Sequence, residues 1–548
     1  MHEERSGSIS RRAALGGAAA LGALALTQLD GGAASASTEA PAASGNGGVN
    51  ARPSTIPALR EWQGRRGGFE LTRSTVILVR TRDTWQLRDI AAVIAADVRA
   101  ATGRLLRVLV SDRRPHRGDI DLRLGAVGAD LGSEGYQLDI GDAVTITAAS
   151  ASGVFYGGQT LLQLLRQSAT VPTGTARDWP TYRERGLMVD VARMYFPLEW
   201  LKARVRDMAS VKLNILSLHL TDDEGWGVES KLGLQSAKYL TKRELTELVA
   251  YASARRITVI PEIDSPAHLG ALLQKYPQYR LVDTNGTTSP SKLDFTIPGA
   301  VDLIKSILAE YLPLFPGQYW HLGQDEYLAN SLFADYPQLE QWAKERVGSA
   351  ATAKDSVIAF ANELNAFVRA RGKRARMWND NLGPGTTINA DSNIVVQWWT
   401  DADPENLFGD TGPYSPQVLV DQGHEVLNDS LLPTYAYPPG GQTPQIDPAW
   451  MYEDWSAEQF YGYLYREDGA GGYQKYLPTK TLSVGNPKQT GSSLNDWNSG
   501  GTWTPDEAAA DLFPRLRIMA QKTWNSPQVT SSYSDFASLI AKTGSVGV

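Results

Sequence analysis

The chain has 548 residues, a net charge of −7 and no basic run that would favour nucleic acid as a partner. Its hydrophobic content of 42% and charged content of 21% are those of a globular protein, and its length predicts more than one domain. Because the sequence contains no cysteine, disulfides, thiolate metal sites and cysteine nucleophiles are excluded.

The N-terminus has the features of an export signal. An arginine pair at residues 11–12 precedes an Ala/Leu/Gly-rich stretch, and residues 34–36 (Ala-Ser-Ala) suit signal cleavage. This stretch is too short and too glycine-rich for a transmembrane anchor, which needs about 20 apolar residues. We therefore predict a twin-arginine signal peptide over residues 1–36, secretion, no membrane partner, and a flexible linker over residues 37–53.

The next segment has mixed patterning. Residues 74–79 and 143–147 are rich in β-branched side chains and predict strands. Apolar residues between them recur at helical spacing up to Gly103, where a helix would end. We expect a second helix after Gly157-Gly158. Strands with helices on one face predict a small α+β domain over residues 54–179.

From Tyr182 onward, apolar strands alternate with amphipathic helices, one of which begins with a capping box at Thr241 and Glu244. Seven or eight such units predict a parallel (β/α)₈ barrel over residues 180–548. The expected strands are residues 186–191, 213–220, 257–264, 319–323, 376–378, 394–398 and 425–427, with an eighth near 492–497.

Polar and aromatic residues follow these strands, at the barrel end where active sites lie. In the fourth strand, Gly323 precedes the adjacent carboxylates Asp325 and Glu326. Neighbours on a regular strand point to opposite faces, but both acids can face one cavity where the backbone bends into a loop. Two carboxylates in different surroundings are what glycoside cleavage requires.

Four ordered blocks resemble glycoside hydrolase family 20, which comprises β-N-acetylhexosaminidases and lacto-N-biosidases. The small preceding domain is similar to the family's non-catalytic companion. The resemblance implies an oligosaccharide or glycoconjugate substrate, no cofactor and no metal. The blocks are Asp190-Val191-Ala192-Arg193, His219-Leu220-Thr221-Asp222-Asp223-Glu224-Gly225-Trp226, Pro261-Glu262-Ile263-Asp264-Ser265-Pro266-Ala267-His268 and His321-Leu322-Gly323-Gln324-Asp325-Glu326.

The resemblance also implies a role for each residue. Glu326 would be the general acid/base, and Asp325 would orient the substrate's acetamido group, whose oxygen replaces an enzyme nucleophile and forms an oxazolinium ion. Tyr435 would bind the acetamido oxygen and Arg193 a sugar hydroxyl. The other implied substrate-binding residues are Trp378, Trp398, Trp497 and Gln324. The implied supporting residues are Asp264, His268 and His321, with Asp222 or Asp223.

Three positions depart from the family's usual pattern. Gln324 replaces a glycine before the acid pair, Tyr437 replaces a carboxylate in Tyr-x-Asp, and Ser499 replaces another in Trp-x-Glu. The two lost carboxylates would bind hydroxyls of a terminal sugar, so their loss favours an open pocket. A long aromatic loop after Tyr437 would line a second subsite. We expect release of galactosyl-β-1,3-N-acetylglucosamine by a lacto-N-biosidase-type enzyme.

Other interpretations remain open at this point. Other side chains could replace the lost carboxylates, which would leave an ordinary exo-β-N-acetylhexosaminidase. A metal-dependent barrel hydrolase could use the histidines and aspartates of the blocks as ligands. A sugar-binding protein without activity would be expected to lack the Asp-Glu pair, which is present here. The sequence leaves the oligomeric state open.

Overall fold

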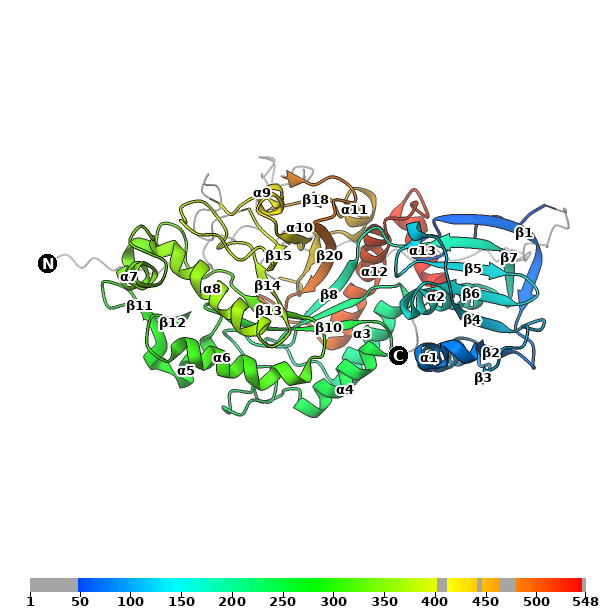
Figure 1. Ribbon diagram of the computed structural model, residues 1–548, viewed down its shortest axis with the longest axis horizontal. Coiled ribbons are helices and arrows are strands. Elements are labelled where there is room, and N and C mark those ends of the chain that lie inside the picture. The colour runs from blue at the N-terminus through cyan, green and yellow to red at the C-terminus, as the bar shows by residue number, and fades with distance from the viewer. Residues whose placement is uncertain (1–47, 402–411, 441–445, 463–479, 545–548) are drawn as a thin grey trace, which may run out of the picture. The chain divides into compact units, whose positions relative to one another are not determined.

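The computed structural model describes residues 48–401, 412–440, 446–462 and 480–544 (Figure 1). The predicted signal peptide and most of the predicted linker lie outside these ranges. Within them, no helix is both long enough and apolar enough to cross a membrane.

The N-terminal domain is built on a seven-stranded mixed sheet in the order β1-β7-β5-β6-β4-β2-β3. Strands β4, β2 and β3 continue in parallel from β6, whereas β1, β7 and β5 are antiparallel. The strands are β1 (Glu61–Glu70), β2 (Val76–Val79), β3 (Arg107–Val110), β4 (Ile120–Leu124), β5 (Tyr136–Ile140), β6 (Val144–Ala148) and β7 (Thr170–Asp178).

Two helices, α1 (Thr84–Thr102) and α2 (Ala151–Gln167), pack on this sheet and against each other. Helix α1 ends at Gly103 in the left-handed region, as predicted. The expected start of α2 was wrong, because the helix begins after the N-cap Ser150 and runs through Gly157 and Gly158. These glycines are places of close packing inside the helix, not its boundary.

The second domain is a closed barrel of eight parallel strands, which confirms the predicted fold class. Strand β16 pairs with β20, and β20 pairs with β8, so the sheet closes on itself. The strands are β8 (Glu184–Asp190), β9 (Ile215–His219), β10 (Thr258–Ser265), β13 (Tyr319–Gly323), β14 (Arg374–Trp378), β15 (Val395–Trp398), β16 (Glu425–Asn428) and β20 (Gln489–Asp496).

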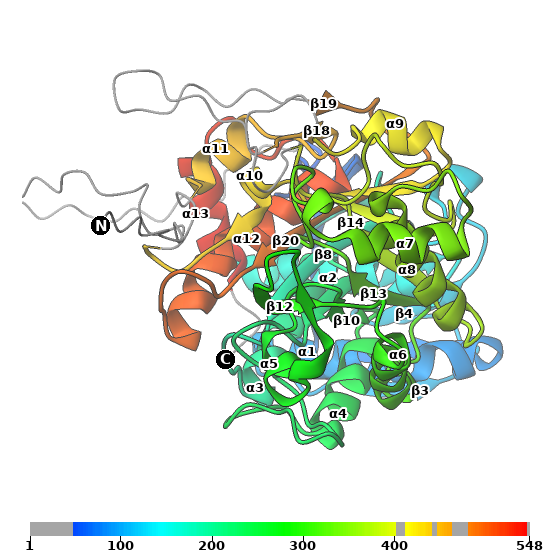
Figure 2. The same ribbon diagram turned by 90° about the vertical axis from the view of Figure 1, so that its left-hand side faces the viewer.

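Helices surround these strands, as Figure 2 shows for α3, α4, α6, α8 and α12. The predicted capping box at Thr241 and Glu244 begins α4. All residues of β8, β9, β13, β15 and β20 are buried, as expected for parallel strands covered on both faces. The helices are α3 (Leu198–Ser210), α4 (Lys242–Ser253), α5 (Gly270–Lys275), α6 (Ala300–Tyr311), α7 (Pro337–Arg346), α8 (Ala353–Arg369), α9 (Pro416–Asp421), α10 (Leu431–Thr434), α11 (Pro448–Glu453), α12 (Pro505–Trp524) and α13 (Tyr533–Thr543).

Short strands complete the barrel domain. Strand β17 extends the main sheet by pairing with β20, and the other four form two small hairpin-like pairs. They are β11 (Arg280–Val282), β12 (Thr288–Leu293), β17 (Tyr435–Ala436), β18 (Gln459–Phe460) and β19 (Lys480–Thr481).

Candidate active site

The C-terminal ends of the barrel strands converge on one pocket. It brings together eleven residues, including the adjacent acids that follow β13. The lining residues are Arg193, Asp222, His268, Asp325, Glu326, Trp378, Trp399, Tyr435, Tyr437, Trp497 and Ser499. Eight of the site residues predicted from sequence line this pocket, and both acids and Asp222 are among them.

The turn that presents the acids has an unusual backbone. Gly323, Gln324 and Glu326 have φ values of +73°, +79° and +48°, so this short segment makes three left-handed steps. A Cβ at Gly323 would lie 1.6 Å from Oδ1 of Asp264, so glycine is required there. The turn directs both carboxylates into the pocket, which regular strand geometry forbids.

Gln324 does not contact the pocket, so its predicted role in substrate binding was wrong. Its side chain is fully buried, and Nε2 donates a hydrogen bond of 2.7 Å to the carbonyl oxygen of Ser265. The backbone N–H of Gln324 meets Asp264 Oδ1 at 3.2 Å. The side chain therefore ties the turn after β13 to the end of β10.

The prediction that Trp398 forms a wall of the pocket was also wrong, because the next residue, Trp399, lines the pocket instead. Because side chains alternate along β15, Trp398 points away from the barrel interior. Outside the barrel it packs against Phe460, with the ring centroids 5.5 Å apart. After the strand ends, Trp399 reaches the pocket and stacks on Tyr435 at 6.2 Å and 14°. Trp378 and Trp497 form further walls.

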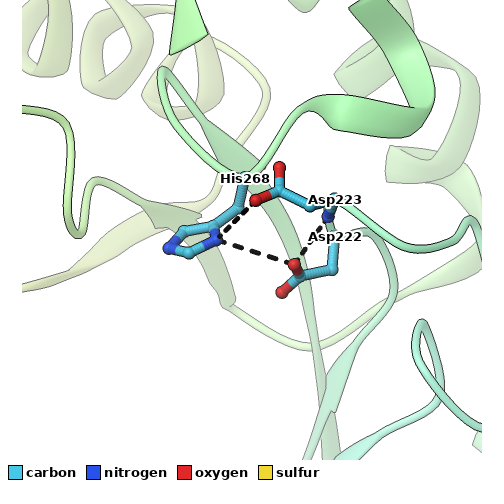
Figure 3. Close-up of side chains that lie close together, drawn as sticks. All are labelled: Asp222, Asp223 and His268. Atoms are coloured by element: carbon cyan, nitrogen blue, oxygen red, sulfur yellow. Dashed lines mark hydrogen bonds and ion pairs between the residues drawn. The ribbon is translucent and has the colours of Figure 1, made fainter. Parts of the chain in front are cut away.

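His268 lies between two pairs of carboxylates. Its Nδ1 is 3.6 Å from an oxygen of Asp222 and from an oxygen of Asp223. Figure 3 shows the ring turned toward both carboxylates. Its Nε2 is 3.4 Å from Asp325 Oδ2 and 3.5 Å from Glu326 Oε2. Burial alone would lower the pKa of His268, but the charges of Asp222 and Asp325 outweigh it and raise the pKa well above its usual value. The imidazolium therefore faces both catalytic candidates.

The sequence left open whether Asp222 or Asp223 is the supporting residue, and the structure gives the two side chains different surroundings. Asp222 is almost completely buried and joins His268 to His219, whose Nε2 lies 2.7 Å from Asp222 Oδ2. Asp223 is more exposed and accepts a hydrogen bond from the backbone N–H of Gly270. Burial would raise the pKa of Asp222, but the charge of His268 holds it well below its usual value.

Glu262 extends this network into the barrel and was not identified as a site residue from sequence. Its carboxylate lies 3.1 Å from His219 Nδ1 and 3.1 Å from His321 Nδ1, and it accepts a 2.7 Å hydrogen bond from Trp378 Nε1. Burial would raise the pKa of Glu262, but the charges of His321 and His219 hold it below its usual value. Strand alternation could have identified Glu262 from sequence, because Glu262 and Asp264 lie on the same face of β10.

Asp264 is buried and contacts the turn that carries the acid pair. Its Oδ1 supports the turn at Gln324, while its Oδ2 has no hydrogen-bond partner among the described residues. Burial and the charge of Asp325 raise the pKa of Asp264 well above its usual value. Asp264 thus lies beneath the acid pair as a buried support, within 4.8 Å of His268 and Asp325.

Arg193 is fixed by three carboxylates. It forms ion pairs with Asp190 at 3.0 Å, Asp222 at 2.6 Å and Glu224 at 3.0 Å. Its guanidinium lies 5.6 Å from the ring centre of Trp497. Burial would lower the pKa of Arg193, but Asp190 and Asp222 raise it, so the residue presents a permanent charge to the pocket.

Asp325 and Asp380 complete the acidic side of the site. Oδ1 of Asp325 is buried and lacks a hydrogen-bond partner among the described residues, so it can accept a donor from a substrate. Asp380, which was not predicted, accepts the backbone N–H of Glu326 at 2.5 Å. Burial and the charge of Asp325 raise the pKa of Asp380 to about 8, since a further charge beside the acid pair is costly.

A divalent cation could in principle use Asp222, Asp223 and His268, whose ligand atoms lie within 4.8 Å of one another. A histidine that ligates a metal must be a neutral imidazole with a free lone pair on the ligating nitrogen. The raised pKa of His268 favours the doubly protonated ring, which donates toward carboxylates on both sides. The arrangement therefore fits an ion-pair network better than a metal centre.

The aromatic residues after Tyr437 mostly pack inward. Tyr452, Trp455 and Phe460 are fully buried, and Tyr452 stacks on Phe536 at 4.2 Å. None of the described members of this segment lines the pocket. Their place in a second sugar subsite stays a prediction, and Tyr463 and Tyr465 lie outside the described residues.

A parallel barrel with adjacent carboxylates, a bridging imidazole and aromatic walls in one pocket has the architecture of a glycoside hydrolase. The model for the catalytic domain of glycosyl hydrolase family 20 matches residues 182–527, and the model for domain 2 of that family matches residues 52–179. The chain belongs to glycosyl hydrolase family 20.

Individual relatives agree with this assignment. The chain is 29% identical to a lacto-N-biosidase of Bifidobacterium bifidum over 90% of its own length, but it spans only 42% of that protein. It is 28% identical to a β-N-acetylhexosaminidase of Cellulomonas fimi, covering 86% of this chain and 90% of that one. The solved N-acetyl-β-hexosaminidase of Streptomyces plicatus is 27% identical, with a TM-score of 0.68 over 90% of this chain and 94% of that one.

Proposed function

We propose that the protein hydrolyses β-linked N-acetylhexosaminides by substrate-assisted catalysis and releases galactosyl-β-1,3-N-acetylglucosamine. The observation that carries the mechanism is the buried Oδ1 of Asp325, which has no hydrogen-bond partner in the described part of the chain and lies beside Glu326 and the imidazolium of His268. An acetamido N–H is a donor that would satisfy this oxygen. This contact would turn the acetamido oxygen toward the anomeric carbon.

In the first step, the acetamido oxygen forms a bond to the anomeric carbon while the bond to the leaving oxygen breaks. Glu326 gives its proton to that oxygen, and Asp325 stabilises the positive charge that develops on the oxazolinium ion. In the second step, Glu326 takes a proton from water, water attacks the anomeric carbon, and the ring opens with net retention. Holding the acetamido group against the carbon is a proximity effect worth up to about 7–11 kcal/mol.

Support for disaccharide release comes from the rim of the pocket. Tyr437 and Ser499 line it at the two positions where the family resemblance implies carboxylates. Hydroxyl groups bind sugar hydroxyls less strongly than carboxylates do, so a terminal sugar loses affinity and a further sugar gains room. The similarity to a lacto-N-biosidase over 90% of this chain points the same way.

Release of a single N-acetylhexosamine is the second candidate. It is favoured by Arg193, which lines the pocket with a fixed charge and can bind hydroxyls of a terminal sugar. The hexosaminidases of C. fimi and S. plicatus, each covered over at least 90% of its length, also favour it.

A comparison of two chromogenic glycosides tests these candidates. One carries lacto-N-biose and the other a single β-linked N-acetylglucosamine. We expect kcat/KM to be higher for the disaccharide, because its second sugar occupies the opened rim. A higher value for the monosaccharide would establish exo-hexosaminidase activity, and cleavage of neither would refute the proposed function.

Substitution of the acid pair tests the mechanism. We expect Glu326→Gln to lower turnover by about 10²–10⁴-fold, because an amide cannot protonate the leaving oxygen. Asp325→Asn should also lower turnover steeply, because a neutral amide does not stabilise the oxazolinium cation. Binding of a thiazoline mimic of that ion, measured by calorimetry, should weaken for Asp325→Asn. Unchanged turnover in Asp325→Asn would contradict substrate assistance.

A further inference from the structure

The turn that carries the acid pair is held by the segment that follows β14. Asn381 donates a side-chain hydrogen bond to the carbonyl oxygen of Gln324. Asp380 accepts the backbone N–H of Glu326 through Oδ2 at 2.5 Å. Glu326 lies in the left-handed region, which an L-residue adopts only when its surroundings impose it. The two contacts therefore help to impose this conformation.

The same carboxylate also reaches a pocket wall. Oδ1 of Asp380 accepts a 3.2 Å hydrogen bond from Nε1 of Trp399, which lines the pocket and stacks on Tyr435. Its neighbour Asn379 accepts the backbone N–H of Trp399 at 2.8 Å. One side chain therefore connects the turn after β13 with the segment after β15, while Asp380 itself does not line the pocket.

We propose that Asp380 is a positioning residue, which sets the direction of the Glu326 side chain and the place of the Trp399 indole through one carboxylate. The inference rests on the proposed acid role of Glu326. The direction of a side chain follows its backbone, so the acceptor of the Glu326 N–H sets where the acid proton points. A displacement of about 1 Å in such a group can cost about 10²-fold in rate.

Burial and the charge of Asp325 raise the pKa of Asp380 to about 8, while the hydrogen bonds from Glu326 and Trp399 act in the opposite direction and favour the ionised carboxylate. Two donors from different segments approach the two oxygens of Asp380. Asparagine has one acceptor oxygen, and its NH₂ group would face the second donor. Asp380→Asn thus removes one of the two contacts with almost no change in size.

The test compares substrates whose leaving groups differ in their need for a proton. Cleavage of a phenyl glycoside depends on protonation of the leaving oxygen, whereas the 2,4-dinitrophenolate of a dinitrophenyl glycoside leaves without a proton. Both carry the sugar that the wild-type protein cleaves. For Asp380→Asn, we expect kcat/KM on the phenyl glycoside to fall about 10–100-fold and that on the dinitrophenyl glycoside to fall less than about 3-fold.

Asp391 provides a matched control in the same β14–β15 connection. It accepts a 2.6 Å hydrogen bond from Asn365 and does not line the pocket. Asp391→Asn should leave the ratio of the two kcat/KM values unchanged. Thermal unfolding of each variant shows whether it folds, and a partly folded variant would lose activity equally on both substrates.

The outcomes distinguish failure of the positioning role of Asp380 from failure of the proposed function. A selective loss on the phenyl glycoside supports the positioning role, whereas equal losses or no loss in Asp380→Asn overturn it while the proposed function stands. If the wild-type protein cleaves neither glycoside, the proposed function fails and the inference fails with it.

Discussion

Asp325 and Glu326 are neighbours in the chain, but the fold gives them different surroundings. The side chain of Asp325 is 15% exposed, with one buried oxygen that no described residue hydrogen-bonds, and that of Glu326 is 28% exposed. His268 faces both of them through one nitrogen. Two adjacent acids can therefore divide two tasks, because the left-handed turn directs each toward a different part of one pocket.

A second buried acid shows how strongly the barrel interior perturbs a carboxyl group. Asp429, which follows β16, accepts hydrogen bonds from Gln397 Nε2 at 2.5 Å and from the Ser493 N–H at 2.9 Å. It is fully buried, and burial raises its pKa to about 7. The folded protein therefore holds a proton on Asp429 over a range of pH where the unfolded chain has released it.

Asp429→Asn should remove a pH-dependent part of the free energy of unfolding. An aspartate in the unfolded chain has a pKa of about 3.9, so stability from this group is full below that pH and is lost as pH rises toward about 7. Relative to wild type, the variant should therefore gain up to about 4 kcal/mol between pH 4 and pH 8. Urea unfolding at both pH values measures this difference, and a constant offset would contradict it.

At the scale of elements, helix α2 depends on glycine for packing. A Cβ at Gly157 would lie 2.5 Å from Cγ2 of Ile146 on β6, and one at Gly158 would lie 2.5 Å from Cδ1 of Ile94 on α1. The helix therefore approaches both the sheet and its neighbouring helix closely. Helix propensity alone disfavours glycine by about 1 kcal/mol, so tertiary packing outweighs local preference here.

Gly157→Ala should destabilise the protein although alanine is the better helix former. Overpacking costs about 1–3 kcal/mol, which exceeds the gain of about 1 kcal/mol in propensity. Introducing the same change into an Ile146→Ala background removes the methyl group that clashes, so its cost should fall there, while the contact with Cδ2 of Tyr136 at 3.1 Å is kept. Denaturant unfolding of the four proteins in this cycle gives the coupling energy. Additive effects would show that the close approach has no energetic consequence.

At the scale of the molecule, a buried ion pair joins the small domain to the barrel. Nζ of Lys212, which follows α3, lies 2.8 Å from Asp178 Oδ2 on β7, and both side chains are fully buried. Lys212 also donates to the hydroxyl of Tyr136 at 2.9 Å. Trp524 of α12 donates to the other oxygen of Asp178 at 2.9 Å. The two domains therefore share one polar cluster.

Lys212→Met should lower the free energy of unfolding by about 3–5 kcal/mol, because it leaves the Asp178 charge buried without its partner. Lys202→Met is the matched control on α3. Lys202 pairs with the exposed carboxylates of Glu199 and Glu247, and such pairs contribute about 0–1 kcal/mol. Denaturant unfolding measures both variants, and equal effects would show that the shared cluster does not couple the domains.

Export by the twin-arginine route remains a proposal, because the residues that suggested it lie outside the described ranges.

The sequence by itself determined the barrel and most of the pocket. Strand and helix periodicity is a local property, so the eight strands could be located, and the capping box at Thr241 and Glu244 located the start of helix α4. The acid pair and His268 come shortly after strands and Trp378 ends one, and parallel strands in a barrel end on the same face. Their convergence could therefore be inferred before any contact was known.

Only the tertiary structure decided which side chain of a close pair faces the pocket. The sequence cannot show where β15 stops and its alternation ends, and this point exchanges Trp398 for Trp399. Gln324 and the aromatic segment after Tyr437 turned inward because neighbours distant in sequence supplied partners for them. The contact of Asp380 with Glu326 joins the segments that follow two neighbouring strands, β14 and β13, and no local sequence pattern encodes it. Such choices depend on long-range packing, which periodicity does not record.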